Sequence, residues 1–157
     1  MMMIDLTTPI IPYVGTGIFK LDASYDEVKT LLAEQNISYT EEISQPNDVD
    51  PPWYIIGIPK VGEEFDAISI TFAKNRLFRI CLYEDFDGKL PNGIHTGMTI
   101  EEALEIDKNL RYNDDNDELY ESPDGYWLDY HRGTRKILTI LIFIPAFERD
   151  DFFEYKW

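Results

Sequence analysis

Two stretches decide the fold that the sequence predicts: SYDEVKTLL at residues 24–32 and TIEEALEI at residues 99–106. In each stretch a hydroxyl residue, Ser24 or Thr99, stands three places before a glutamate. This is the spacing of a capping box, in which the hydroxyl accepts a hydrogen bond from an N–H of the first helical turn and the glutamate accepts one from the N–H of the cap residue. Apolar residues follow at helical intervals, so each stretch predicts a helix with one apolar face. The helices are expected over about residues 24–35 and 100–109.

Around these helices, apolar and polar residues alternate with a period of two, which is typical of half-buried strands. The segment 136–144 is apolar on both of its faces, and such a strand belongs in the centre of a sheet. Residues 4–19 carry prolines and glycines among apolar residues, which indicates an irregular or edge-strand lead-in. The predicted strands are 37–43, 53–58, 66–73, 77–83, 119–121, 126–131 and 136–144, with Lys74-Asn75-Arg76 as a hairpin turn.

The two capped helices indicate that one module is built twice. A shift of 72 residues aligns Ile140 with Ile68, and a shift of 75 residues aligns Phe152-Phe153 with Leu77-Phe78. Phe152-Phe153 would then form the last strand. The predicted fold class is α+β: two helix-plus-four-strand repeats form one curved, mostly antiparallel sheet of about eight strands, with the helices on one face. The alternative is one irregular α+β domain without duplication. We expect a single domain over residues 1–157, with a first repeat at 13–83 and a second at 93–157.

The composition is strongly acidic. The chain has 30 acidic and 14 basic residues and a net charge of −16, which repels nucleic acid and anionic membranes and favours a cationic partner. Its single cysteine, Cys81, cannot form an internal disulfide. The N-terminus lacks the basic segment of a signal peptide, and no apolar run reaches the ~20 residues of a membrane-spanning helix. The expected location is therefore the cytosol.

No motif for catalysis or metal binding stands out. His95 and His131 are far apart in the sequence and have no further ligand at zinc-site spacing. The acidic run at residues 114–118 is followed by Leu119, where a calcium-binding EF-hand loop needs glycine. The common phosphate-binding, dinucleotide-binding and hydrolase signatures do not occur in the sequence. We therefore expect no metal, no cofactor and no enzyme activity.

Two acidic clusters remain, one at residues 84–87 and one at residues 113–125. They are either solvated loops or a partner-binding surface, because carboxylates interleaved with aromatic side chains combine charge steering with anchors. If the loops only solvate the chain, the alternative interface is the polar sheet face that bears Ser69, Thr71, Arg79 and Tyr83. The candidate partner-binding residues are Glu84, Asp85, Asp87, Tyr112, Asp114, Asp115, Asp117, Glu118, Tyr120, Glu121, Asp124, Tyr126 and Trp127.

The paired modules resemble the two-repeat architecture of the β-lactamase-inhibitor-protein-like superfamily. The matching pieces are Gly17 with residues 24–32, the strand at 53–58, Gly97-Met98-Thr99 with Glu102, and Tyr126-Trp127. The chain lacks the paired cysteines and signal peptide of the secreted members. In its small size and acidity it is also similar to the immunity proteins of bacterial contact-dependent growth inhibition, which bind and block a toxin domain, often a basic nuclease.

These resemblances imply a non-enzymatic inhibitor. The expected function is that of a cytosolic immunity protein that binds and neutralises a cationic toxin domain, with a nuclease (RNase or DNase) as the expected class. One alternative is an acidic adaptor with a different basic partner. The other is a hydrolase that uses paired carboxylates such as Asp115 and Glu118.

Overall fold

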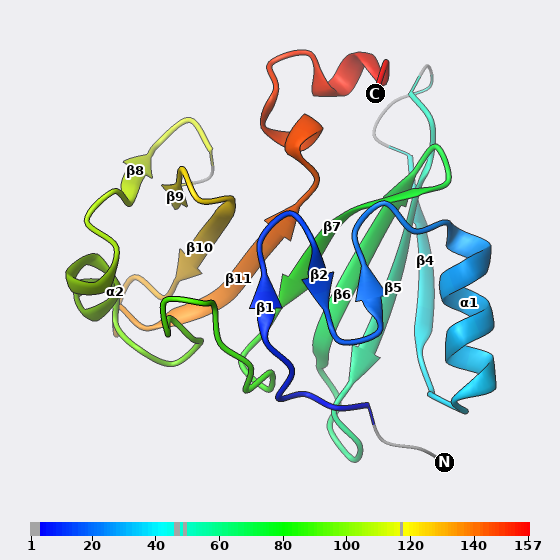
Figure 1. Cartoon of the computed structure of the whole chain (residues 1–157), viewed down its shortest axis with the longest axis horizontal. Coiled ribbons are helices and arrows are strands. Elements are labelled where there is room, and N and C mark those ends of the chain that lie inside the picture. Colours follow the sequence, from blue (N-terminus) through cyan, green and yellow to red (C-terminus); the bar gives the residue numbers. More distant parts are fainter. Residues whose placement is uncertain (1–3, 46–47, 49, 117) are drawn as a thin grey trace.

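A computed structural model of the chain describes residues 4–45, 48, 50–116 and 118–157. These residues form two antiparallel sheets and two short α-helices (Figure 1). The small sheet contains β1 (Ile10–Ile11), β2 (Gly15–Thr16) and β3 (Phe19–Lys20). The large sheet has the strand order β4 (Thr40–Ser44), β5 (Trp53–Pro59), β6 (Asp66–Ala73), β7 (Arg76–Leu82), β11 (Ile137–Phe143), β10 (Tyr126–Tyr130), β9 (Leu119–Ser122) and β8 (Arg111–Asn113).

Both predicted helix starts are confirmed. Helix α1 spans Tyr25–Glu34 and α2 spans Ile100–Ile106, and each begins with a complete capping box. The Ser24 hydroxyl accepts a hydrogen bond from the Glu27 N–H at 3.1 Å, and the Thr99 hydroxyl accepts one from the Glu102 N–H at 3.2 Å. Helix α2 ends earlier than expected, at Asp107, whose side chain is held by other partners described below. Within the described part of the chain, neither helix is long and apolar enough to cross a membrane.

The strands predicted from alternation are confirmed within a few residues, although β4 begins later than expected. Strand β8 was missed, and so were the strands of the small sheet, because the sequence predicted only an irregular or edge-strand lead-in over residues 4–19. The turn between β6 and β7 is confirmed as well, since Lys74 and Asn75 both have positive φ angles, as a two-residue hairpin turn requires. The apolar strand β11 lies at the centre of the sheet, between β7 and β10. Buried strands need apolar residues on both faces, which explains its sequence.

The predicted fold class is wrong. The described residues form a mostly antiparallel β protein with two sheets, and the two helices contain only 10 and 7 residues. Figure 1 shows the small sheet in front of the large one, and α1 and α2 lie at opposite ends of the large sheet. The alignment of Ile140 with Ile68 fails too, because both residues pair with Leu82, from the two sides of β7. The alternation of apolar and polar residues predicts a strand but does not predict which strands lie beside it. The faint sequence similarity between the two predicted repeats therefore did not identify residues at equivalent positions in the sheet.

The C-terminus is the second correction. Phe152-Phe153 form no strand; the segment contains the 3-10 turns η1 (Pro145–Glu148) and η2 (Phe152–Glu154). Pro145 has no N–H to give to a sheet and favours the start of a helical turn. The Phe152 ring is buried and packs on Phe78 and Trp157, at centroid distances of 5.2 and 5.0 Å. An aromatic cluster thus replaces the expected strand.

The large sheet has one apolar face and one mixed face. Isoleucines of β5, β6, β7 and β11 lie opposite one another in a buried row that faces the small sheet and the helices: Ile56, Ile70, Ile80 and Ile142. The next row points the other way and contains Gly57, Ser69, Cys81, Leu141 and Trp127. We call this second side the outer face of the large sheet. The predicted polar residues Ser69, Thr71, Arg79 and Tyr83 belong to it, because side chains alternate along a strand.

Candidate functional site

A pocket of about 600 Å³ lies on the outer face, next to the turn between β5 and β6. Its lining contains five carboxylates and no lysine or arginine, and we call it the acidic pocket. The carboxylates come from three places: the β5–β6 turn with the start of β6, the segment after β7, and β10. The lining residues are Glu63, Phe65, Asp66, Tyr83, Glu84, Asp85, Asp129, Leu138 and Thr139.

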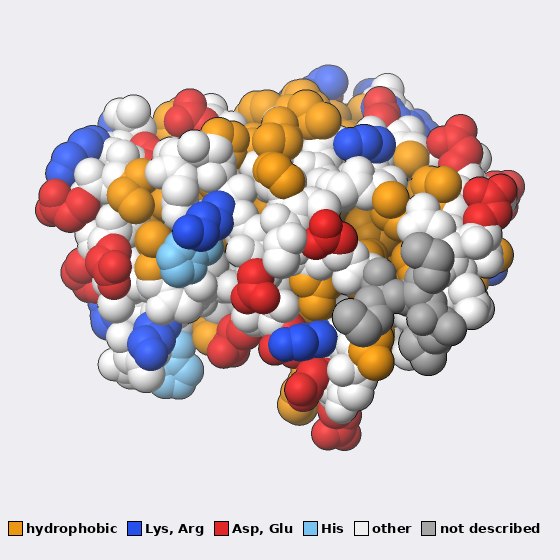
Figure 2. All heavy atoms as spheres, turned by 60° about the horizontal axis from the view of Figure 1, so that its bottom comes forward, with side chains coloured by type: hydrophobic (Ala, Val, Ile, Leu, Met, Phe, Trp, Pro, Cys, Tyr) orange, Lys and Arg blue, Asp and Glu red, His pale blue; other side chains and the backbone are white. Residues whose placement is uncertain are grey.

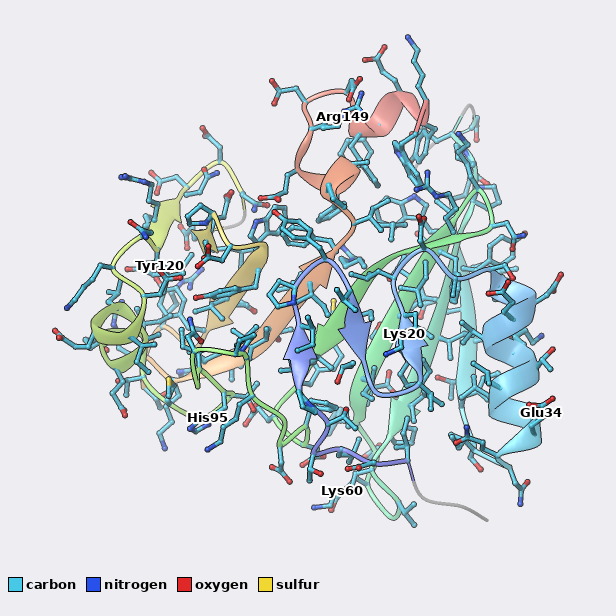
Figure 3. The ribbon with its side chains drawn as sticks, viewed as in Figure 1. Lys20, Glu34, Lys60, His95, Tyr120 and Arg149 are labelled. Atoms are coloured by element: carbon cyan, nitrogen blue, oxygen red, sulfur yellow. The ribbon has the colours of Figure 1, made fainter. Side chains whose placement is uncertain are left out.

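The β5–β6 turn projects from the body at the bottom of Figure 1, and Lys60 at its start is labelled there in Figure 3. Figure 2 brings this side forward and shows acidic and basic side chains interspersed over the body, with acidic side chains at the tip of the projection. Lys60 is not among the residues that line the acidic pocket. The lining of the pocket therefore carries only negative charge, whereas the rest of this side carries charges of both signs.

The pocket carboxylates have no internal partners. Among the described residues, none of the five accepts a hydrogen bond or forms an ion pair. Burial raises the pKa of Asp66, and the neighbouring charge of Glu42 raises it further. A Cβ atom at Gly57 would lie only 2.2 Å from Asp66 Oδ2, so the glycine leaves room for this carboxylate above the sheet. The pocket thus holds negative charge that the fold itself does not neutralise.

Aromatic side chains and a hydroxyl complete the pocket. Phe65 on the β5–β6 turn lines the pocket and is 79% exposed. The half-buried Tyr83 contributes its phenol, whose pKa is raised to about 12, chiefly by burial. Thr139 on β11 is only 9% exposed, and its hydroxyl has no hydrogen-bond partner among the described residues. The pocket therefore combines its carboxylates with an apolar ring and with hydroxyl groups that can form hydrogen bonds.

The structure brings part of the first predicted cluster into this pocket. Glu84 and Asp85 line it, whereas the exposed Asp87 does not, and its backbone N–H donates to Leu6 O at 2.7 Å. The sequence reasoning missed the other pocket residues, above all Glu63, Asp66 and Asp129. A partial signal was present in Glu63-Glu64-Phe65, where a large apolar residue adjoins acid in a predicted turn. Asp129 gave none, because one acidic residue in a strand is ordinary.

The second predicted cluster lies elsewhere, on the β8–β9 hairpin at the left of Figure 3, where Tyr120 is labelled. The rings of Tyr112, Tyr120 and Tyr130 contact one another in series, with centroids 5.4 and 5.5 Å apart. Glu118 forms an ion pair with Arg132 at 2.8 Å. Asp114, Asp115 and Asp124 are exposed, and Asp117 lies outside the described residues.

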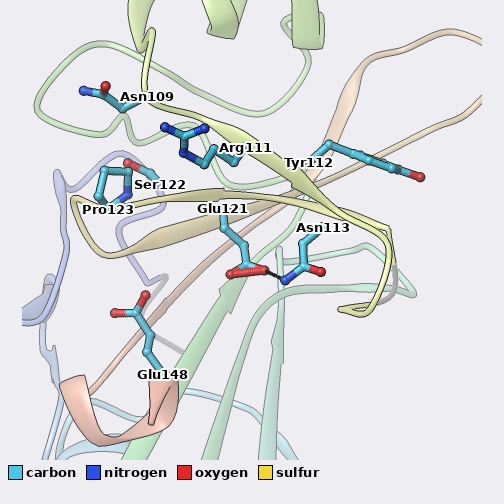
Figure 4. Close-up of a pocket in the computed structure, with 8 residues that line it drawn as sticks. All are labelled: Asn109, Arg111, Tyr112, Asn113, Glu121, Ser122, Pro123 and Glu148. Carbon is cyan, nitrogen blue, oxygen red and sulfur yellow. Dashed lines mark hydrogen bonds between the residues drawn. The ribbon is translucent and has the colours of Figure 1, made fainter. Parts of the chain in front are cut away.

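A further pocket of about 510 Å³ lies beside this hairpin and reaches Glu148 of η1 (Figure 4). Its acidic groups are engaged: Glu121 accepts hydrogen bonds from Asn113 at 2.6 Å and from Asn116 at 3.1 Å. Glu148 accepts one from the Tyr13 hydroxyl at 2.6 Å. These carboxylates join segments of the chain to one another.

Two predicted aromatic anchors are largely inside the protein. Tyr126 is 1% exposed, and its hydroxyl donates to Asp107 Oδ2 at 2.5 Å and accepts from Asn92 Nδ2 at 3.1 Å. Trp127 packs on Phe143 and Phe147, and its indole N–H is buried. Because Tyr126 and Trp127 pack against other side chains, substituting either residue would reduce the stability of the fold.

Asp107 is a buried carboxylate that the sequence reasoning did not single out. It accepts hydrogen bonds from Tyr126, from the Ser122 hydroxyl at 2.8 Å and from the Asn109 N–H at 2.9 Å. Burial raises the pKa of Asp107, but these hydrogen bonds outweigh it and hold the pKa below its usual value. The network ties the end of α2 to β9 and β10.

The two histidines are separate. His95 Nδ1 lies 2.7 Å from Thr96 O, and the exposed His131 accepts hydrogen bonds from the N–H groups of Gly133 and Thr134. Within the described ranges, no three His, Cys, Asp or Glu side chains are close enough together to hold a metal ion.

Comparison with known proteins gives no guide to the family. No protein-family model matches the chain, and no curated protein and no solved structure gives a significant match. Function is therefore inferred from the geometry and charge of the molecule itself.

Proposed function

We propose that this chain is a non-enzymatic inhibitor: a cytosolic immunity protein that binds and neutralises a cationic toxin domain, with a nuclease as the expected class. One observation carries the proposal. Five carboxylates without internal partners surround one pocket on the outer face, and no basic residue lines it. Unneutralised charge of this kind is best stabilised by positive charge that a partner supplies.

The net charge of −16 supports the same partner class. A nuclease carries a basic surface for phosphates, and a carboxylate-rich surface presents negative charge where phosphates would lie. Charge of this magnitude speeds the encounter of the two proteins. The exposed Phe65 adds apolar area at the pocket, and aromatic anchors of this kind supply much of the binding energy in protein interfaces.

The β8–β9 hairpin has a smaller part in the proposed interface. Tyr112 is 46% exposed, and Asp114, Asp115 and Asp124 are free to contribute to long-range attraction. Tyr126 is buried in the core, and the half-buried Trp127 packs on Phe143 and Phe147, so neither residue is assigned to the interface. The acidic pocket is the proposed centre of binding.

Two alternatives use the same residues differently. An adaptor with another basic partner would use the same pocket, and only the identity of the partner separates it from an immunity protein. A hydrolase needs two carboxylates with pKa values pushed apart in a concave site. Asp115 is exposed and Glu118 is paired with Arg132, so this pair gives the hydrolase little support.

Co-expression tests the proposal. The product of the adjacent reading frame is induced in bacteria with and without this chain, and growth is measured. We expect wild type to restore growth, and we expect a variant with Glu84→Gln, Asp85→Asn and Asp129→Asn to lose most of that protection.

A matched control removes the same charge elsewhere, at exposed positions that line no part of the pocket: Asp26→Asn, Glu34→Gln and Asp150→Asn. Its protection should equal that of wild type. If wild type does not restore growth and forms no stable complex with that product, the immunity function is wrong.

A further inference from the structure

We infer that the acidic pocket receives an arginine side chain of the partner, with the Thr139 hydroxyl as an acceptor at its floor and the Phe65 ring as a stacking surface. The inference deepens the proposed function and rests on it for the source of the arginine. It concerns the chemistry of the pocket, however, and can be tested without the toxin.

Thr139 forms the floor of the acidic pocket and supplies a hydroxyl group there. Thr139 lies on the central strand β11 and is about nine-tenths buried, yet its hydroxyl has no partner in the described part of the chain. The Thr139 oxygen is not among the fully buried side-chain atoms that lack a partner, so it is reached from the pocket. An N–H donor that enters the pocket would satisfy this group and reach the carboxylate of Asp129, which is directly opposite Thr139 across the β10–β11 pair.

The second step is the kind of cation. The carboxylates come from three parts of the chain around a pocket of about 600 Å³, and the described residues hold no group compact enough for a metal ion. Bare metal ions require several ligands within about 2.0–2.6 Å of one point. A cation with several donors spread over a larger frame fits this arrangement better.

The third step separates arginine from lysine. A guanidinium group presents five N–H donors in one plane, whereas an ammonium group is a compact and strongly hydrated point charge. Five donors can serve the separate walls and the floor at once. The plane can also stack on an aromatic ring, and Phe65 lines the pocket and is 79% exposed.

The test is a nuclear magnetic resonance titration of the ¹⁵N-labelled chain with three small probes. These are the N-acetyl N-methylamides of arginine, lysine and citrulline; citrulline has the shape of arginine without its charge. We expect the arginine probe to shift the amides of Tyr83, Glu84, Asp129 and Thr139 at millimolar concentration. The lysine probe should bind at least threefold more weakly, and the citrulline probe should cause no shifts.

Three substitutions locate the contacts. Thr139→Val keeps the shape of the side chain and removes the hydroxyl, and it should weaken arginine binding about threefold or more. Asp129→Asn should weaken it about tenfold, and Phe65→Ala should remove the preference over lysine. Thr30→Val on the exposed side of α1 is the matched control and should change nothing.

The spectra of each variant also report folding, and Asp129→Asn and Phe65→Ala lie at less buried positions if Thr139→Val disturbs β11. Equal binding of arginine and lysine, shifts spread evenly over the acidic surface, or unchanged affinity in Asp129→Asn would overturn the inference. Failure here with growth protection intact refutes only the arginine pocket. Arginine binding without protection refutes the immunity function and leaves the pocket assignment standing.

Discussion

The acidic pocket and the β8–β9 hairpin are both rich in carboxylates, but they differ in whether the fold uses that charge. On the hairpin, Glu118 is held by Arg132 and Glu121 by two asparagine side chains. In the pocket, none of the five carboxylates has a partner among the described residues. A high local density of acidic residues in the sequence is therefore a poor guide to a binding site. What matters is whether the folded chain leaves the charge unsatisfied.

The aromatic residues near the two regions show the same contrast. Tyr126 adjoins the acidic hairpin in sequence but lies in the core, where its hydroxyl binds Asp107. Phe65 adjoins the pocket and is almost fully exposed. Burial of an aromatic side chain stabilises the monomer, whereas an exposed one is available to a partner.

The largest effect is expected beneath the hairpin, for Asp107→Ala. This change removes the acceptor of the Tyr126 and Ser122 hydroxyls and leaves buried donors unsatisfied. We expect a loss of about 3 kcal/mol in the free energy of unfolding, measured by urea denaturation. The exposed Asp114→Ala serves as control and should remain within about 0.5 kcal/mol of wild type. Equal stability of the two variants would remove the assigned role of the Asp107 network.

The next effect concerns Phe65→Ala, which should separate binding from stability. An exposed side chain contributes little to folding, so the free energy of unfolding should change by less than about 0.5 kcal/mol. Binding of the toxin domain should weaken by about 2 kcal/mol if the ring is an anchor. Calorimetry on the purified complex measures this loss, and Tyr112→Ala on the hairpin gives the comparison. A larger loss for Tyr112→Ala would move the centre of the interface to the hairpin.

A smaller effect, with a defined pH dependence, is expected for Asp66→Asn. Burial and then Glu42 raise the pKa of Asp66 in the folded state above its unfolded value of about 3.9. The favourable contribution of the protonated carboxyl is present below that unfolded value and is lost as pH rises through the folded pKa. Asp66→Asn avoids this loss, so the variant should gain stability relative to wild type between pH 3 and pH 7.

Thermal unfolding over this pH range measures the gain of Asp66→Asn, and Asp114→Asn is the control without it. A stabilised variant that binds its partner more weakly would indicate that the pocket retains charge for binding at the expense of stability. Constant relative stability across the range would contradict the assigned burial of this carboxylate.

The smallest effect is expected for Glu118→Gln on the hairpin. Its ion pair with Arg132 is exposed, with the two side chains 54% and 47% accessible, and water screens such pairs strongly. The midpoint of urea denaturation should stay within experimental error of wild type, and protection in the co-expression assay should be unchanged. A clear loss of protection would show that the hairpin contributes more than steering.

The sequence by itself determined the features that depend on neighbours within a few positions. Both capping boxes, the turn at Lys74 and Asn75, and the place of β11 in the centre of the sheet were predicted from spacing and alternation. Such features follow from hydrogen bonds and side-chain directions over three or four residues, so they carry over to the folded chain. The net charge, and with it the class of partner proposed, is also a property of composition.

Only the tertiary structure decided which carboxylates meet. Glu63, Glu84 and Asp129 belong to distant parts of the sequence. The pairing of β6 with β7, of β7 with β11 and of β11 with β10 brings the segments that carry them together. The pairing of β2 with β1 and with β3 forms a second sheet, which the expected repeats did not contain. Strand pairing is non-local: alternation determines which side chains share a face of a strand, but the choice of neighbouring strand depends on packing across the whole core.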